Sequence, residues 1–166
     1  MATYGASNNL LVSKFDSAHL PCPLGERIKN GQSEYMLVLS KDTITVGMCV
    51  QWKPSVAPSA RQVIRTDHTS TVTMGLACGF AMCSNVTGDY FFIKVKGPYN
   101  SAIDPTLITD GSAAINGFCA PSATTDGTII AGVLGTDDGN MVCRNTQADS
   151  GNDLTEYIVC GPLMGA

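Results

Sequence analysis

The stretch Gly88-Asp-Tyr-Phe-Phe-Ile-Lys-Val-Lys-Gly-Pro98 decides the fold class of this chain. Aromatic and β-branched residues fill it between two glycines, which is the composition of a β-strand. The run Tyr90-Phe91-Phe92 interrupts strict polar–apolar alternation. It therefore predicts a strand covered on both faces, on one by the core and on the other by a partner. Because successive side chains alternate, we expect Phe92 and Lys94 on one face and Ile93 on the other.

Working outward from this strand, the chain alternates short apolar runs with turn signals. It holds seventeen glycines and sixteen threonines. Five turn pairs supply the positive φ that tight hairpins need, namely Asn30-Gly31, Asp110-Gly111, Asn116-Gly117, Asp126-Gly127 and Asp138-Gly139. We expect strands near residues 34–39, 43–52, 61–66, 70–83, 89–96, 105–109, 115–120, 127–134, 139–144 and 154–160. Turn signals at this spacing predict an all-β fold, an antiparallel β-sandwich or β-barrel.

The first residues have a different character. Residues 1–32 include Pro21-Cys-Pro23 and few alternating runs, which predicts an extended N-terminal arm that is ordered by the surface on which it lies. Residues 33–166 are then a single β-sandwich or β-barrel domain. Helical patterns are weak, and the best short candidates are Asn9–Phe15 and a turn near Pro58–Gln62.

Composition excludes several classes of protein. Of 166 residues, 44% are hydrophobic and 14% are charged, with a formal net charge of −4. An acidic, charge-poor chain is a poor candidate for binding nucleic acid through phosphates. No run of 18 apolar residues predicts a membrane-spanning helix, and the N-terminus has no signal-peptide pattern, so we expect neither nucleic-acid nor membrane partners.

The charge is divided unevenly along the chain. Residues 1–66 carry seven basic and four acidic residues, a net of +3, whereas residues 67–166 carry three basic and ten acidic ones, a net of −7. A solvated mixed surface accounts for this distribution. The alternative hypothesis is that the N-terminal part lies on a negatively charged partner.

Seven cysteines, an odd number, argue against a complete disulfide framework. They are Cys22, Cys49, Cys78, Cys83, Cys119, Cys143 and Cys160. None forms the C-x-x-C pair of zinc or redox sites. Five of them lie in apolar, strand-like runs, so we interpret them as small buried hydrophobic residues that stay reduced. This interpretation implies synthesis in a reducing cytoplasm.

Two residue pairs suggest catalysis only weakly. His19 and Ser150 have neighbours reminiscent of the chymotrypsin-like proteases, but too few residues precede His19 and follow Ser150 to build that fold. Cys78 and His68 could form a nucleophile–base pair, but no nucleophile-elbow motif surrounds Cys78. We predict a protein without enzymatic activity and without catalytic residues.

Cofactor and metal motifs are equally weak. No phosphate-binding glycine loop is present. Asp137-Asp-Gly-Asn140 lacks the spacing of a calcium loop and reads as a hairpin turn, while Asp149, Asp153 and Glu156 form a loose acidic loop. We predict no cofactor-binding and no metal-binding residues. Trp52 is expected at the edge of the core or in an interface.

The order of several motifs resembles the small head decoration, or cement, proteins of tailed bacteriophages and related virion proteins. The resemblance covers roughly residues 34–160. Its elements are the segment Met74–Cys83, the glycine-flanked aromatic strand 88–98, the turns Thr109–Gly117 and Pro121–Gly127, the strand Ile130–Gly135 and the closing strand Tyr157–Cys160.

This resemblance implies a structural virion protein that decorates and stabilises a capsid by bridging capsomers. Its partners would be the major capsid protein and two further copies of itself in a homotrimer, and its place would be the capsid exterior. The alternative is a tail, fibre or receptor-binding β module of a virion, for which Trp52 and Tyr99 would be the eligible exposed aromatic residues. An enzyme, a serine or cysteine protease using Ser150 or Cys78, is a third hypothesis.

Overall fold

The protein is almost entirely β-structure, as expected. The computed structural model describes residues 7–54, 56–67, 77–111, 117–132, 141–146, 153–154 and 157–160. The strands in chain order are β1 (Lys14–Phe15), β2 (Arg27–Asn30), β3 (Ser33–Ser40), β4 (Cys49–Trp52), β5 (Gln62–Arg65), β6 (Ala77–Ala81), β7 (Tyr90–Pro98), β8 (Leu107–Ile108), β9 (Phe118–Pro121), β10 (Ile129–Ala131), β11 (Cys143–Asn145), β12 (Asp153–Leu154) and β13 (Tyr157–Val159). The helices are α1 (Asn8–Leu11) and a 3₁₀ turn at Pro58–Ala60.

Five strands close into a barrel, which decides between the two predicted architectures. Pairing runs from β3 to β7, β6, β4 and β5, and β5 returns to β3. Four of these pairings are antiparallel, but β3 and β5 are parallel, with Leu39 opposite Gln62. The antiparallel expectation therefore needs correction at this one seam. Closure leaves no unpaired edge around the ring.

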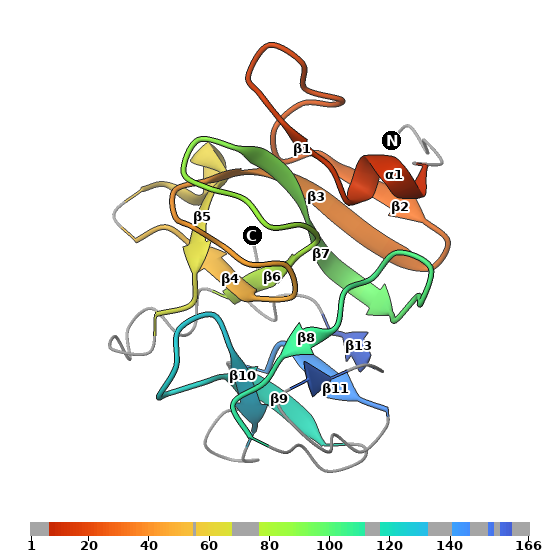
Figure 1. The fold of residues 1–166 in the computed structure, drawn as a ribbon, viewed down its shortest axis with the longest axis vertical. Coiled ribbons are helices and arrows are strands. Elements are labelled where there is room, and N and C mark those ends of the chain that lie inside the picture. The colour runs from red at the N-terminus through yellow and green to blue at the C-terminus, as the bar shows by residue number, and fades with distance from the viewer. Residues whose placement is uncertain are drawn as a thin grey trace.

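Strand β7 pairs with more elements than any other strand described and thereby organises the molecule. One edge of β7 pairs with β3 along most of its length, from Tyr90 to Lys96. The other edge pairs in succession with β1 at Tyr90–Phe91, with β6 at Ile93–Lys94 and with β13 at Gly97–Pro98. A single long strand thus joins the N-terminal segment, the barrel and the C-terminal part of the chain (Figure 1).

A second sheet continues from the end of β7. Its order is β10, β9, β11 and β13, all antiparallel, and β8 pairs separately with β12. Figure 1 shows these cyan-to-blue strands grouped below the barrel. Eleven buried residues from β4, β6 and the C-terminal elements, among them Phe80, Leu107, Cys143 and Tyr157, form one core between the two parts.

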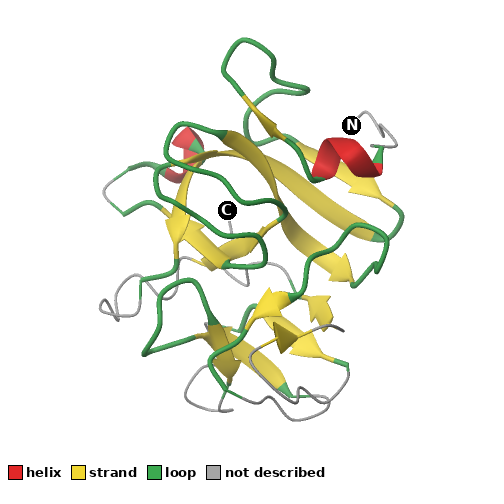
Figure 2. Ribbon diagram, in the orientation of Figure 1, coloured by secondary structure: helices red, strands yellow, loops and turns green. Residues whose placement is uncertain are grey.

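The segment predicted as an extended arm is folded onto its own barrel. Residues of β1 and β2 pair with β7 and β3, and the Asn30-Gly31 turn joins β2 to β3, so the predicted boundary at residue 32 falls inside a hairpin (Figure 2). Leu11 and Ile28 are buried. The arm prediction missed this because its apolar residues are spaced irregularly, without the period of a helix or a strand.

The same segment corrects the expectation about β7. Phe91 and Ile93 face the barrel interior, in a cluster to which all five barrel strands contribute. Phe92 lies on the outer face, where it packs with Leu11 and Ile28. The strand is covered on both faces, as predicted, but the second cover is the N-terminal segment of this chain and not a partner.

Several predicted strands are shorter than expected. Residues 43–48 form turns joined to Asn85 through a bridge at Ile44, and only Cys49–Trp52 pair as a strand. The expected helix at 9–15 is a single turn that ends at Leu11 before β1. Residues 70–76 of the strand expected at 70–83, and residues 133–134 of the one expected at 127–134, lie outside the described residues.

Candidate functional site

The catalytic residues considered from the sequence have ordinary structural surroundings where they are described. The His19 side chain is 80% exposed, and its Nδ1 lies 2.9 Å from Asp16 Oδ1. Cys78 is buried and contacts the Val50 carbonyl at 3.6 Å. Burial raises the pKa of the Cys78 thiol well above its ordinary value, so it holds little of the reactive thiolate. Ser150 and His68 lie outside the described residues.

The acidic segments considered as metal sites are described only in part. Residues 137–140, Asp149 and Glu156 lie outside the described residues, and Asp153 lies in β12. Nowhere in the described ranges do three or more His, Cys, Asp or Glu side chains gather in a way that could hold a metal ion. Among the same residues, no helix has the length and apolar character to span a membrane.

The cysteines divide by burial. Cys49, Cys78, Cys119 and Cys143 are buried, and none of the seven cysteines, all of which are described, forms a disulfide. Cys119 and Cys143 lie directly opposite each other on β9 and β11. Cys160, which the sequence placed in a buried strand, is exposed beyond the end of β13.

An internal ion pair that the sequence analysis did not identify holds the far end of β7. The Lys94 ammonium donates to the Asp104 carboxylate, and both side chains have no exposed surface. Tyr35 Oη donates to Asp104 Oδ1 at 2.9 Å, and the Asn100 amide donates to Oδ2 at 2.7 Å. Burial lowers the pKa of Lys94, while the bond to Asp104 acts in the opposite direction. The only sequence signal is a lysine inside an apolar strand.

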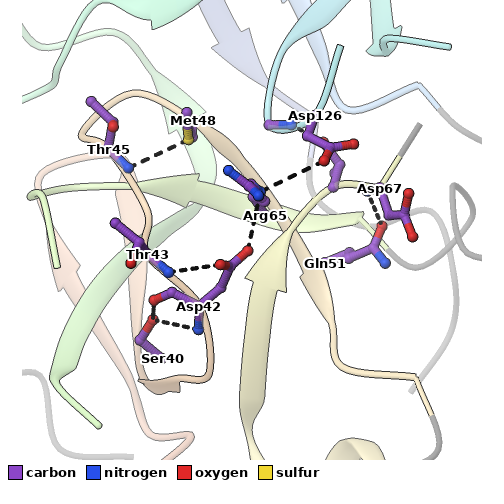
Figure 3. Close-up of polar contacts among 11 residues, drawn as sticks. Ser40, Asp42, Thr43, Thr45, Met48, Gln51, Arg65, Asp67 and Asp126 are labelled. Atoms are coloured by element: carbon purple, nitrogen blue, oxygen red, sulfur yellow. Dashed lines mark hydrogen bonds and ion pairs between the residues drawn. The ribbon is translucent and has the colours of Figure 1, made fainter. Parts of the chain in front are cut away.

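A second charged contact joins the barrel to the second sheet. Arg65 on β5 reaches Asp42, after β3, at 3.2 Å from its Nε, and Asp126, in the turn before β10, at 3.7 Å (Figure 3). Figure 3 also shows the Thr43 amide donating to Asp42, which orients that carboxylate toward Arg65. Because the Arg65 side chain is 43% exposed, water screens the pair and it contributes little to stability.

A partly exposed cation–π pair lies on the barrel surface at the seam between β4 and β5. The Arg61 guanidinium lies over the ring of Trp52, with 5.6 Å between its Cζ and the ring centroid. Both residues are half-buried. Trp52 packs against the barrel core, as expected for a residue at the core edge. The register of β4 against β5 brings the pair together, which no local pattern in the sequence encodes.

The backbone at Arg61 is held in an unusual conformation. Its φ is +52°, and it is the one non-glycine with positive φ among the described residues. A Cβ on Gly25 would lie 2.5 Å from Arg61 Nε, so the bare Cα of this glycine leaves the space through which the arginine passes. Backbone strain of this kind costs about 1–3 kcal/mol and persists where surrounding contacts impose it. Here the Arg61 carbonyl oxygen accepts a hydrogen bond from the Leu39 backbone N–H, with 3.0 Å between nitrogen and oxygen.

The cations of the structure fall into two groups. Five are ion-paired, namely Lys14 with Asp89, Arg27 and Lys29 with Glu34, Arg65 with Asp42 and Asp126, and Lys94 with Asp104. Four described cations make no ion pair with a described residue, namely Lys41, Lys53, Arg61 and Lys96. The first three border β5, because the Lys41 and Lys53 amides donate to Val63 and Gln62 and Arg61 immediately precedes the strand, whereas Lys96 lies on β7.

Comparison with solved structures finds a similar fold in a bacteriophage protein. No protein-family model and no curated protein matches the sequence. The crystal structure of the head fiber gp8.5 N base in bacteriophage phi29 matches with a TM-score of 0.50 and 9% sequence identity. The match covers 79% of this chain and 98% of that one. At this identity the likeness concerns the fold alone.

Proposed function

We propose that this chain is a structural protein of a bacteriophage virion, mounted on the exterior of the capsid, where it binds the major capsid protein and stabilises the shell by bridging capsomers. The observation that carries the proposal is the shared fold with the phi29 head fiber base, which spans nearly all of that chain. The motif order between residues 34 and 160 supports it independently, because it resembles head decoration proteins.

The protein acts in this role without enzymatic chemistry. Copies that bind only the assembled shell shift its stability by mass action, so many weak contacts suffice. A compact barrel whose strand β7 is covered on both faces over most of its length suits a rigid structural protein of this kind. Synthesis in a reducing host cytoplasm fits the buried thiols.

The protein is proposed to act as a homotrimer. The outer face of the second sheet carries Ile158 on β13 and Ile130 on β10, which are 40% and 37% exposed. Apolar side chains of this size on a sheet face are suited to contacts between copies. Light scattering of the purified chain at low and high salt tests this part, with a trimer stable in high salt as the expected result and a monomer as the contradicting one.

The head fiber likeness also bears on the alternative function, a fibre or receptor-binding module. In that case the chain would be the base that attaches a fibre to the head. Tyr99, one of the two aromatic residues considered for glycan contact, is packed against Tyr157 with 5.2 Å between the ring centroids, so it is not free to stack on a sugar.

The deciding experiment uses assembled shells of the cognate phage with and without the protein. We expect the chain to sediment with shells and to raise the temperature at which they release DNA. Bursting of both preparations at the same temperature would contradict the stabilising role. Sedimentation without stabilisation would favour the fibre-base alternative.

A further inference from the structure

We propose that Trp52, Arg61 and Lys53 form a docking site for a carboxylate-rich protein surface. The inference rests on the proposed function only for the identity of that partner, the capsid. The site lies where β4 ends and β5 begins, beside the 3₁₀ turn at Pro58–Ala60. Its three side chains are half-buried, so each keeps part of its surface for a partner.

Five of the ten basic residues are paired with a carboxylate of the same chain, but Arg61 and Lys53 have no ion pair with a described residue. Lys41 adds a third such cation on the other side of β5. Among the described residues, three cations without an ion pair therefore gather around β5, although the whole chain is acidic.

The Arg61 guanidinium is held in position before any partner binds. The Trp52 ring, the space at Gly25 and the +52° φ of Arg61 together fix the guanidinium in one place. A guanidinium fixed in this way pays little entropy when it forms a paired hydrogen bond with a carboxylate. Trp and Arg are also the residue types that dominate binding energy at protein interfaces.

The chemistry favours a protein partner over nucleic acid. Three cations that have no ion pair with a described residue neutralise few phosphates, so the site supplies little of the charge that nucleic-acid binding requires. A local acidic patch on a protein needs only two or three matched charges. The occupant of this site is therefore a surface bearing clustered Asp or Glu side chains.

Trp52 is the only tryptophan in the chain, so its fluorescence reports directly on this site. The probes are poly-L-glutamate and a single-stranded DNA of equal charge. We expect a saturable change in Trp52 emission with polyglutamate that weakens as salt screens the charges. Arg61→Gln and Lys53→Gln should each weaken binding, with Arg61→Gln raising the dissociation constant about tenfold.

The matched control is Lys96→Gln, because Lys96 is an exposed lysine opposite Glu34, near the other end of β3. Equal binding by Arg61→Gln and Lys96→Gln, or no response to polyglutamate, would overturn the proposal. Tighter binding of DNA than of polyglutamate would overturn the protein partner. Thermal melts establish that each variant is folded, and Lys53→Gln provides a second test that leaves the strained residue intact.

Shell binding separates this inference from the proposed function. If wild-type protein sediments with shells and Arg61→Gln does not, the docking site and the proposed virion function are both supported. If wild-type protein and Arg61→Gln sediment equally, this site does not bind the capsid, while the proposed virion function is still supported. If wild-type protein fails to sediment but responds to polyglutamate, the proposed function fails and the carboxylate-binding site remains.

Discussion

The Lys94 amine and the Asp104 carboxylate meet where the barrel joins the second sheet, with both side chains fully buried. Lys94 lies at the middle of β7, and Asp104 lies in the loop that leads to β8. Asp104 also holds the hydroxyl of Tyr35, which lies on β3. One carboxylate therefore ties two barrel strands to the connection between the two parts of the molecule.

Removing one partner of this pair should destabilise the protein strongly. Lys94→Met leaves the Asp104 charge buried without its counter-ion, and we expect a loss of about 3–5 kcal/mol in the free energy of unfolding. Lys96→Met is the control, since Lys96 is exposed on the same strand and should change stability by no more than about 0.5 kcal/mol. Urea denaturation measures both. Equal stability of the two variants would show that the pair does not hold this junction.

Close backbone approach at Gly47 predicts a second large effect. A Cβ there would lie 2.1 Å from the Thr106 carbonyl oxygen, and φ is +84°. Gly31 also has a positive φ, +59°, but nothing lies within 4 Å of its Cβ position. Gly31→Ala should therefore lose only the conformational cost of about 1–2 kcal/mol.

Gly47→Ala pays the same conformational cost and also displaces the backbone that leads into β8. We expect it to be at least about 2 kcal/mol less stable than Gly31→Ala in thermal or urea unfolding. Two variants of equal stability would mean that the barrel and the second sheet are not packed together at this point.

The parts of the fold that sequence could predict are those fixed by local pattern. The strands near β3, β5 and β7 follow from apolar runs between turn residues. Each of these runs is contained in a few consecutive residues, so the sequence predicts it directly. Closure of the barrel is not local, because it depends on the direct parallel pairing of β3 with β5, which β4 separates along the sequence. No single window of sequence contains that information.

The candidate site shows the same division. Trp52 could be placed at an edge or interface from its position after a strand. Its contact with Arg61 needs the β4–β5 register and the space at Gly25, which is distant in sequence. Lys94 was placed on the correct face of β7, but its burial depends on Asp104 and Tyr35, which reach it only through the tertiary fold.

The N-terminal segment should behave as part of the barrel. Leu11 is fully buried against the outer face of β7, whereas its neighbour Val12 is 41% exposed. Leu11→Ala should cost about 2–5 kcal/mol, and Val12→Ala no more than about 0.5 kcal/mol. Chemical denaturation of the isolated chain is the measurement. A neutral Leu11→Ala would restore the original expectation, an arm that is ordered only on a partner.

The buried thiols predict that stability falls at alkaline pH. Burial raises the pKa of Cys49 and Cys78, and a hydrogen bond with Cys119 together with burial raises that of Cys143; the ordinary value of each thiol is 9.0. Below that value both folded and unfolded chains keep these protons, and stability is flat. Above it the unfolded chain releases them while the folded chain retains them, so unfolding is favoured as pH rises. Each group contributes a slope of about 1.4 kcal/mol per pH unit.

Lys94 acts in the opposite direction. Its pKa is lowered in the folded chain, so between that value and 10.5 the folded chain loses its proton first and gains stability as pH rises.

One lysine opposes three thiols, so the net slope of the free energy of unfolding against pH remains negative above pH 9. Urea denaturation from pH 7 to pH 10, with a reducing agent present, measures it. In the double variant Cys49→Ala/Cys78→Ala, the free energy of unfolding is referred to the variant's own value at pH 7. Its slope against pH should then be smaller than that of the wild type by about 2.8 kcal/mol per pH unit. An unchanged slope in this variant would show that other groups control the alkaline transition.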